Sequence, residues 1–595
     1  MNKAFNQYGK LVDIIESIKE DTYTCPVCKE ILTRNFGAIK QFYSHPFGKG
    51  DGCELKFNYM IKDNNNFYNE NEIDILRKEY YEKTFDDVKI ELSDYMSDEG
   101  YYLTQEQKDI IFAEEDRIKI AALAGASKSH TLYYYAKNRP FKKILYVVYN
   151  KSMRMEADLM YKNLPFVTVK TQHALAFGHI GRFYKDKLTL NYGIVDIIKD
   201  LNLNWNKDME LAAKIDCMMK EYMLSDVIEF DDMQLFLDNN GNTNNEREEI
   251  IRQCKRLWEL KKTYKNRIGV EHDFYLKLYH LAQVDLSNKY DIIMVDECQD
   301  LSKLLLDILK FSNVPGIVMV GDKFQSLYSW RKSTNIMPLF DGKEYKLTTS
   351  FRVSQNIAHI ANIIISDFIG ENIQMKGFNI KQTIVDEIDK TKPYVCLCRT
   401  NAYIFSEVAD ALDRDRSKKL YFEGGFQSYK FLNLKDCYFY SQGHTTKNKL
   451  FSKFKDFNTM QAYAEEIKDI ELLSMIRMVD KYGSRIVTIV DSIKNNTVSS
   501  KDKADIIFST IHRAKGATFS LPVYISNDHL DIESVYKNKY INPDEKSKEE
   551  KDISEEIFII YVSITRGSRK VELSEGIKKY LMLRYKHLKE KIINN

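Results

Sequence analysis

The sequence has little of what marks several classes of protein. It contains only 9 Pro and 24 Gly in 595 residues, which argues against long linkers and low-complexity tracts. Its 9 Cys are spread along a long chain and do not suggest a disulfide framework. No run approaches the roughly 18 apolar residues of a membrane span, and the N-terminus lacks the apolar core of a signal peptide. We therefore expect a soluble, intracellular protein that makes no use of a membrane.

A strong overall charge is also missing. The chain has 88 Lys and Arg against 86 Asp and Glu, which gives a net charge of +2. A surface that binds nucleic acid would therefore have to be a local stripe. What the chain does have is length and a composition that is 44% hydrophobic, enough for several domains that each bury a core.

One short hydrophobic stretch ends in two adjacent carboxylates. Residues 290–300 read Tyr-Asp-Ile-Ile-Met-Val-Asp-Glu-Cys-Gln-Asp, so Asp296 and Glu297 directly follow the apolar run. This pattern predicts a buried parallel strand with acids at its C-terminal edge, where open α/β sheets bind ligands. One carboxylate can hold Mg²⁺ while its neighbour orients or deprotonates a water. The simpler alternative is a solvated acidic turn.

A second stretch has the layout of a phosphate-binding loop. A predicted strand over 118–122 leads through a loop of small residues into a helix, and an earlier helix start is capped at Thr104. In such loops backbone N–H groups cradle phosphate, a lysine reaches its oxygens and a hydroxyl binds Mg²⁺. The residues that would do so are Gly125, Ala126, Ser127, Lys128 and Ser129. The match is imperfect, since Ser127 stands where glycine is expected, and an ordinary strand–turn–helix is the alternative.

Polar clusters follow other predicted strands in the same way. Strands over 144–148 and 167–171 precede Tyr149, Asn150, Lys151 and His173, and a strand over 316–321 precedes Gln325 and Trp330. The second half continues with strands predicted over 394–398, 506–510 and 558–562. Residues 178–269 and 426–504 lack such signals and are expected to be helical insertions.

The N-terminal region contains a candidate zinc site. Cys25 and Cys28 form a Cys-x-x-Cys pair, and His45 and Cys53 follow in turn-rich sequence. A Cys₃His set of this kind is typical of a structural zinc module. Two buried thiols beside an unrelated histidine are the alternative.

Taken in order, these segments resemble the motifs of superfamily 1 helicases of the UvrD/Rep/PcrA type over about residues 103–570. These motifs are most similar to those of the F-box DNA helicase branch, although we identify no F-box in this sequence. Four sequence motifs carry this closer resemblance: Tyr149-Asn-Lys151, His272-Asp-x-Tyr-Leu-Lys-Leu, Leu347-Thr-x-Ser-Phe-Arg352 and Glu423-Gly424-Gly425.

The resemblance implies an α/β protein with two RecA-like parallel-sheet P-loop NTPase domains, each carrying a mainly helical insertion. The expected divisions are a zinc module (1–60), a helical linker (61–100), core domain 1A (101–177 and 270–345), insertion 1B (178–269), core domain 2A (346–425 and 505–595) and insertion 2B (426–504). The implied activity is ATP-driven movement on single-stranded DNA or at junctions with duplex, with 3′→5′ polarity, in replication, recombination or repair. Such a protein would be located with the DNA, in the cytoplasm or, in a eukaryote, the nucleus.

The resemblance also implies roles for single residues. ATP and Mg²⁺ would be bound by the phosphate loop, Asp296, the adenine-reading Gln107 and the base-stacking Phe351. Catalysis would rest on Glu297 as general base, Gln325 as γ-phosphate sensor, and the arginine fingers Arg352 and Arg566. Contacts to DNA would come from Tyr149, Asn150, Lys151, His173 and Trp330, the last by base stacking. The N-terminal module could bind a protein partner.

Two departures from the family pattern favour a second reading. Ser127 places a Cβ where the loop needs glycine, and Thr518 stands where the family has a glutamate. A position demanding φ > 0 at Ser127 would cost roughly 1–2 kcal/mol. The alternative is therefore a weakened ATPase that acts as a nucleotide-switched DNA clamp or scaffold. A metal-dependent nuclease is disfavoured, because no separate acidic cluster has nuclease-like spacing.

Overall fold

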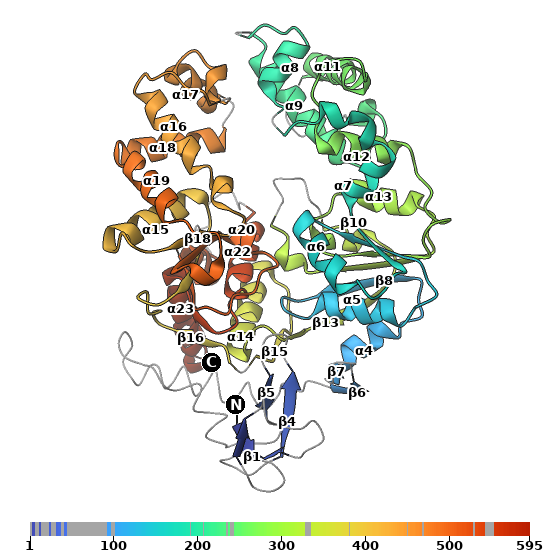
Figure 1. Cartoon of the computed structure of the whole chain (residues 1–595), viewed down its shortest axis with the longest axis vertical. Helices are drawn as coiled ribbons and strands as arrows, with labels where there is room; N and C mark the ends of the chain where they lie inside the picture. Colours follow the sequence, from blue (N-terminus) through green and yellow to red (C-terminus); the bar gives the residue numbers. More distant parts are fainter. Residues whose placement is uncertain are drawn as a thin grey trace.

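The computed structural model describes residues 102–594 apart from 191, 206, 234–235, 238–242, 328–334, 380, 449, 467–468, 527–529 and 542–551. Nearer the N-terminus it describes only the backbone of six short strands: β1 (Lys3–Phe5), β2 (Leu11–Asp13), β3 (Tyr23–Thr24), β4 (Ile31–Phe36), β5 (Gln41–Ser44) and β6 (Leu92–Met96). Two parallel sheets lie side by side at the middle of Figure 1, and a group of helices extends above each. The predicted α/β class is confirmed.

The first sheet has six parallel strands. Its order is β10 (Val167–Thr171), β9 (Ile144–Val148), β11 (Ile292–Val295), β12 (Gly316–Gly321), β8 (Arg117–Ala122) and β13 (Lys343–Leu347). Helices α4 (Gln105–Ile111), α5 (Lys128–Lys137), α6 (Lys151–Met160), α7 (Gln172–His179), α12 (His272–Leu281) and α13 (Lys303–Phe311) connect or cover them. Separate apolar cores lie on the two faces, so β9, β11 and β12 are buried throughout.

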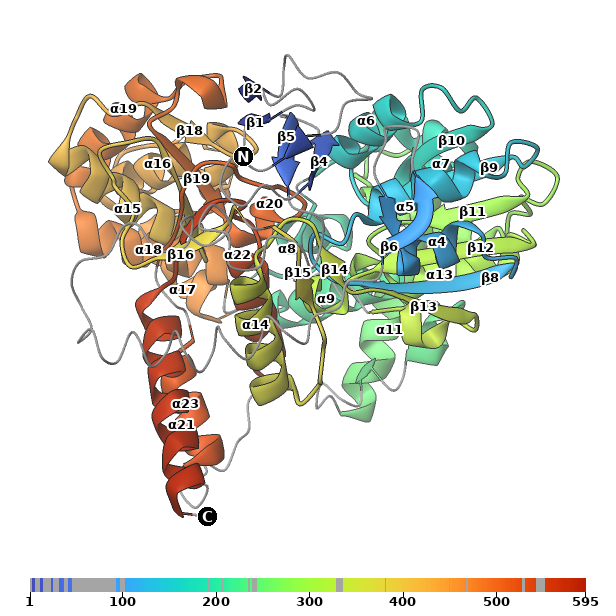
Figure 2. The ribbon, with the colours of Figure 1, turned by 90° about the horizontal axis from the view of Figure 1, so that it is seen from below.

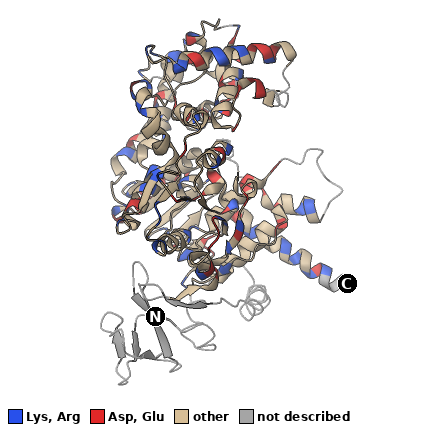
Figure 3. Cartoon of the chain, turned by 90° about the vertical axis from the view of Figure 1, so that its right-hand side faces the viewer, with Lys and Arg blue, Asp and Glu red and all other residues tan. Residues whose placement is uncertain are grey.

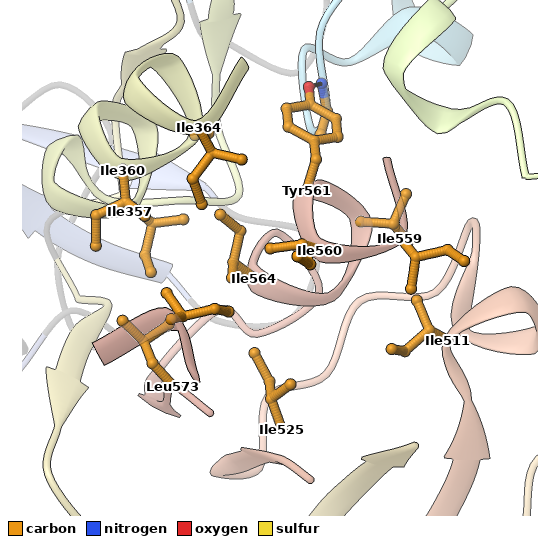
Figure 4. Close-up of a cluster of buried hydrophobic side chains, with 14 of the residues drawn as sticks. Ile357, Ile360, Ile364, Ile511, Ile525, Ile559, Ile560, Tyr561, Ile564 and Leu573 are labelled. Atoms are coloured by element: carbon orange, nitrogen blue, oxygen red, sulfur yellow. Dashed lines mark hydrogen bonds between the residues drawn. The ribbon is translucent and has the colours of Figure 1, made fainter. Parts of the chain in front are cut away.

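The second sheet is also entirely parallel. Its order is β16 (Thr383–Val385), β21 (Lys570–Glu572), β20 (Val523–Ile525), β17 (Tyr394–Cys398), β19 (Ile506–Thr510) and β18 (Leu420–Phe422). One face is covered by α14 (Gln355–Ile364) and α22 (Ser554–Ile564), whose isoleucines meet Ile511, Ile525 and Leu573 in one cluster (Figure 4). The same cluster includes Leu123, Ala124, Phe324 and Leu327 from the first half. The two sheets therefore share a continuous apolar interface.

The predicted strand over 558–562 is wrong, because these residues lie inside α22. From Ile557 through Ile564 every residue of the helix is buried except the half-buried Phe558. A helix without a solvent-facing side loses its polar positions, so a run of β-branched residues reads like a buried strand.

Helical insertions leave each sheet. Between β10 and β11 the chain forms η2 (Gly181–Lys187), α8 (Ile194–Asp200), α9 (Met209–Leu224), η3 (Phe230–Met233) and α11 (Asn244–Lys262). Between β18 and β19 it forms α16 (Phe431–Ser441), α17 (Phe457–Glu466), α18 (Ile470–Tyr482) and α19 (Arg485–Asn496). The two insertions touch: Ile194 and Met209 pack against the second, and Lys453 Nζ lies 3.6 Å from Asp196 Oδ2.

The remaining elements are at the periphery. Strand β6 pairs with β7 (Tyr102–Thr104), so part of the predicted helical linker is a strand instead. Helices α21 (Ile532–Tyr540) and α23 (Glu575–Asn594) pack together and project from the body (Figure 2). Among the described residues, no helix combines the length and apolar character needed to cross a membrane.

Candidate active site

The two carboxylates that follow β11 are buried. Asp296 and Glu297 are 3% and 9% exposed, which rules out a solvated acidic turn. Asp296 Oδ2 accepts from Tyr146 Oη at 2.6 Å, and Oδ1 accepts from the backbone N–H of Glu297 at 2.8 Å. Burial and the neighbouring Glu297 raise the pKa of Asp296. The strand edge thus holds two interacting acids inside the protein.

Glu297 is paired with the lysine of the predicted phosphate loop. Lys128 Nζ lies 2.8 Å from Glu297 Oε1, and both side chains are 12% exposed. Burial opposes ionisation of Glu297, but Lys128 and Lys515 outweigh it and hold the pKa of Glu297 at about 2. The carboxylate is therefore charged at neutral pH, and its charge is neutralised mainly by Lys128.

The loop between β8 and α5 has left-handed backbone at two positions. Gly125 has φ of 76°, and a Cβ there would lie 2.5 Å from Ser350 Oγ and 2.6 Å from Arg352 Cβ. Ser127, directly before Lys128, has φ of 57° and is the N-cap of α5. A side chain in this region costs about 1–2 kcal/mol. Ser127 therefore has the positive φ at which backbone strain of this size is expected.

Two arginines from the second half lie at the same site. Arg566 is fully buried and donates from Nη2 to Gln325 Oε1 at 3.3 Å and from Nε to the carbonyl of Val562 at 3.0 Å. Arg352 follows the loop-contacting Phe351, whose N–H donates to the carbonyl of Gly125 at 2.9 Å. Burial, reinforced by Arg352, lowers the pKa of Arg566 to about 9. The predicted residues Lys128, Asp296, Glu297, Gln325, Arg352 and Arg566 are thus brought together.

Tyr561 is a member of the site that sequence reasoning missed. Its hydroxyl accepts from the backbone N–H of Ala124 in the loop at 3.0 Å and donates to Asp322 Oδ2 at 3.0 Å. Asp322 also accepts from Gln325 Nε2 at 2.7 Å. Its position five residues before Arg566 is a usable signal only if residues 558–562 are helical, whereas their apolar pattern predicts a strand.

Two further contacts tie the acidic strand to its surroundings. Gln299 donates to Glu297 Oε2 and accepts from the N–H of Asp322 at 3.0 Å, which links the acids toward Gln325. Lys515, from the second half, pairs with buried Asp300 and donates to the carbonyl of Gln325 at 2.5 Å. Burial raises the pKa of Asp300 to about 6 against the opposing effect of Lys515.

The two residues predicted to hold the adenine differ in availability. Gln107 is 2% exposed; its Oε1 accepts from Thr104 N at 3.0 Å, and its Nε2 donates to Thr131 Oγ1 at 3.3 Å. In this structure its amide serves the N-terminal capping box of α4. Phe351 is half-buried beside Phe378, with ring centroids 5.6 Å apart. Its ring is therefore the better placed of the two to meet a base.

The predicted DNA contacts lie around α6 and α7. Asn150 and Lys151 are exposed, Tyr149 is half-buried, and Asn150 Oδ1 caps α6 by accepting from Met153 N at 2.9 Å. His173 Nε2 lies 2.9 Å from Asp273 Oδ1. An open cavity of about 730 Å³ adjoins them, lined by Arg154, His173, Ala174, Phe177, Gly178, Leu188, His272 and Tyr275.

Trp330 and the predicted zinc ligands Cys25, Cys28, His45 and Cys53 lie outside the described residues. Within the described part of the chain, no group of three or more His, Cys, Asp or Glu side chains is arranged to hold a metal.

Comparisons with known proteins agree with this arrangement. Residues 103–345 match the family model described as UvrD/REP helicase N-terminal domain. The predicted resemblance to UvrD-like superfamily 1 helicases is confirmed. The UvrD-like match covers β7 through most of β13, and so contains Lys128, Asp296, Glu297 and Gln325.

The relatives include two F-box DNA helicases. F-box DNA helicase 1 of Gallus gallus is 28% identical over 516 residues, covering 82% of this chain and 50% of the relative. F-box DNA helicase protein 1 of Schizosaccharomyces pombe is 26% identical over 528 residues, covering 81% of this chain and 58% of the relative. A probable DNA helicase II homolog of Mycoplasma capricolum is 23% identical over 325 residues, covering 47% and 42%. The chain thus spans about half the length of these relatives.

Proposed function

We propose that this protein is an ATP-dependent DNA helicase or translocase with two RecA-like core domains. The observation that carries the proposal is that Arg352, packed against Gly125 of the loop, and Arg566, bonded to Gln325, lie within electrostatic reach of Glu297 in the Lys128–Glu297 pair. Neither arginine has a carboxylate hydrogen-bond partner in the described part of the chain; their acceptors are carbonyl, hydroxyl and amide oxygens. Two neighbouring guanidinium groups in a buried site are costly unless an anion joins them. A nucleotide phosphate is such an anion.

The residues present also fit a nucleotide with its metal. The loop offers backbone at the N-terminus of α5, where phosphate is stabilised, and left-handed Gly125 admits no side chain. Ser129 and Asp296 supply the hard oxygen donors that Mg²⁺ prefers. Held there, Mg²⁺ would neutralise charge on the phosphates.

The Lys128–Glu297 pair gives the site a way to couple binding to base strength. While Lys128 neutralises Glu297, the low pKa of this carboxyl makes it a poor base. When Lys128 turns to the nucleotide phosphates, Glu297 loses its main counter-charge and its pKa rises. Gln299, which donates to Glu297 Oε2, then keeps the freed carboxylate oriented toward a water. Arg352 and Arg566 stabilise charge that develops on the γ-phosphate.

Movement on DNA would follow from changes at the interface between the sheets. The contacts that cross it join Arg566 to Gln325, Lys515 to Asp300, and Tyr561 to both Asp322 and Ala124. Each contact would tighten or break as the nucleotide state changes, which shifts the two core domains relative to each other. Single-stranded DNA as track, junctions as substrates, 3′→5′ polarity and a role in replication, recombination or repair belong to this proposal.

The test is an ATPase assay on the purified full chain with and without oligo(dT). We expect Mg²⁺-dependent turnover that single-stranded DNA stimulates. Glu297→Gln, which keeps shape and hydrogen bonding, should lower kcat by about 100-fold or more. Strand displacement from partial duplexes with 3′ or 5′ tails then determines polarity. Absence of turnover by the parent protein would refute the motor.

The left-handed Ser127 favours a second candidate, a slow ATPase that switches a DNA clamp. A loop strained before Lys128 could bind nucleotide yet position it poorly for hydrolysis. This reading expects tight nucleotide binding with little turnover, and recovery of turnover in Ser127→Gly. Equal turnover in the parent and in Ser127→Gly would rule it out.

A further inference from the structure

Two short segments form the neck by which the first helical insertion joins its sheet. We call residues 181–190 and 261–270 the neck. They lie side by side: Val270 N donates to the carbonyl of Lys187 at 2.9 Å, and Thr189 N donates to that of Val270 at 3.0 Å. A parallel bridge between Leu188 and Val270 continues the pairing. Segments far apart in the sequence thus make one surface.

The neck carries a strong local charge in a chain that is nearly neutral. It holds seven cationic residues, Arg182, Lys185, Lys187, Lys261, Lys262, Lys265 and Arg267, against the single acid Asp186. Its net charge of +6 exceeds the +2 of the whole chain. In the helices of the insertion itself, lysine and arginine are mixed with acidic residues (Figure 3). The neck is therefore a local basic stripe of the kind that attracts polyanions.

Two of these lysines form hydrogen bonds and an ion pair that hold the neck together. Lys187 Nζ donates to the carbonyls of Lys261 and Thr263 and to Asn266 Oδ1, at 2.7–3.0 Å. Lys261 pairs with Glu271 at 2.6 Å. The carbonyls at the C-terminal end of α11 are natural acceptors for such cations. The backbone of the neck is thus fixed from within.

The outward-facing cations have no comparable task. Arg182, Lys185, Lys265 and Arg267 are exposed. None of the four forms an ion pair with another residue that the structure describes. Their charges remain open to solvent and to a ligand.

Two aromatic rings lie among these cations. Phe183 and Tyr264 are 58% and 59% exposed, one on each segment, with ring centroids 6.5 Å apart. The guanidinium of Arg182 lies 4.9 Å from the Phe183 ring centroid. Behind them, buried Tyr184 packs on Tyr264 at 4.8 Å. Two neighbouring exposed rings within a basic surface form an apolar patch of the kind that can mark an interaction site.

The neck is continuous with the predicted DNA contacts. Helix α7 begins at Gln172, beside His173, and runs directly into η2 of the neck. The cavity that includes His173 also includes Leu188 of the neck and Phe177, against which Gly181 packs. A DNA strand bound at His173 would therefore continue along the same surface to Phe183 and Tyr264.

We propose that the neck is a stacking platform for single-stranded DNA, an inference that rests on the proposed function. Arg182, Lys185, Lys265 and Arg267 contact phosphates, while Phe183 and Tyr264 stack on unpaired bases. Single-stranded rather than duplex DNA is favoured because base faces are accessible to rings only when the bases are unpaired. The insertion then grips the strand at its base, next to the sheet that binds nucleotide.

The experiment measures binding of the full chain to labelled oligo(dT) of about 20 nucleotides and to a blunt hairpin duplex of similar charge. Phe183→Ala with Tyr264→Ala should weaken oligo(dT) binding about tenfold and leave duplex binding within about twofold. Phe141→Ala, at a 96% exposed ring elsewhere, is the matched aromatic control. Arg182→Gln, Lys265→Gln and Arg267→Gln together should weaken binding to both DNAs and lower the salt slope on oligo(dT) by about 2.

The charge control is Arg477→Gln with Lys481→Gln and Lys494→Gln, exposed cations on α18 and α19. Thermal melting checks that the neck variants remain folded, as their exposed side chains lead us to expect. Oligo(dT) binding that survives loss of both rings unchanged would overturn the platform while leaving the proposed function intact. An equal loss on duplex would overturn it in favour of a duplex-binding surface. A parent protein that binds no oligo(dT) at all would instead remove the proposed function together with the platform.

Discussion

The candidate active site and the neck are both rich in cations, yet they hold them in opposite ways. In the active site Lys128 and Arg566 are enclosed by protein and held by Glu297 and Gln325. On the neck the outward-facing lysines and arginines are exposed to solvent. Charges in the interior interact strongly and at fixed geometry, whereas exposed charges are screened by water and salt. The same residue types are therefore suited to chemistry in one place and to tolerant binding in the other.

This difference predicts how each region responds to substitution. In the active site the identity and position of each cation should matter, because its partners remain buried when it is lost. On the neck the number of cations and rings should matter more than any one of them. Four experiments sharpen or break this comparison.

The largest effect is expected from Arg566→Ala, which removes a fully buried guanidinium from the site. We expect kcat for ATP to fall by about 1000-fold, as for loss of an arginine finger. Arg267→Ala on the neck should act differently, by raising the oligo(dT) concentration needed for half-maximal stimulation. Steady-state ATPase kinetics separate the two, with Arg485→Ala, at an exposed side chain on α19, as control. A kcat for Arg566→Ala within about threefold of the parent would remove Arg566 from the chemistry.

The next largest effect is expected on stability, from removal of Lys515, the cation that lies between the two sheets. Lys515→Met leaves Asp300 buried, 5% exposed, without its ion-pair partner. The free energy of unfolding in urea should fall by about 3 kcal/mol. Adding Asp300→Asn should restore most of it, because the uncompensated charge is gone. Lys265→Met on the neck should change it by less than about 0.5 kcal/mol; similar losses for both lysines would contradict the comparison.

Acid should reveal the buried pair of Lys128 and Glu297. Because folding depresses the pKa of Glu297 to about 2, its contribution to stability is present above the unfolded value and is lost as pH falls toward 2. Between about pH 5 and 2 the parent should therefore lose about 2 kcal/mol more than Glu297→Gln. Urea unfolding at several pH values checks this, and parallel curves for the two proteins would argue against the pair.

The smallest effect concerns the backbone at Ser127. Glycine adopts φ of 57° without a Cβ penalty, so Ser127→Gly should raise the free energy of unfolding by up to about 1 kcal/mol. Ser127→Ala keeps the Cβ and should give no such gain. Thermal or urea unfolding of the three proteins decides, and a gain in the alanine variant would point to the hydroxyl rather than to backbone strain.

Much of the sheet architecture could be predicted because its strands are buried on both faces. The runs over 144–148 and 394–398 are the strands β9 and β17, residue for residue, and the strands expected to begin at Val167 and Ile506 are β10 and β19. Parallel strands end at a common edge, so the polar groups after β8, β11 and β12 had to meet. The grouping of Lys128, Glu297 and Gln325 is a consequence of that rule.

Contacts between distant segments could not be predicted in the same way. Lys515 and Asp300 are buried partners, but nothing local to either residue indicates the other. Tyr561 was missed because a helix buried on all sides has no polar period to separate it from a strand. The neck was missed because its two segments, 181–190 and 261–270, are far apart in the sequence, and nothing local to either indicates that they pair.

The hydrogen bond from the Ala124 amide to the Tyr561 hydroxyl has a kinetic consequence. Donor and acceptor belong to opposite sides of the interface between the sheets, so this amide proton can exchange with solvent deuterium only when the interface opens. The hydrogen-exchange rate of the Ala124 amide therefore reports how often the interface opens. Followed with and without nucleotide, a single amide would time the motion that the two halves of the protein make against each other.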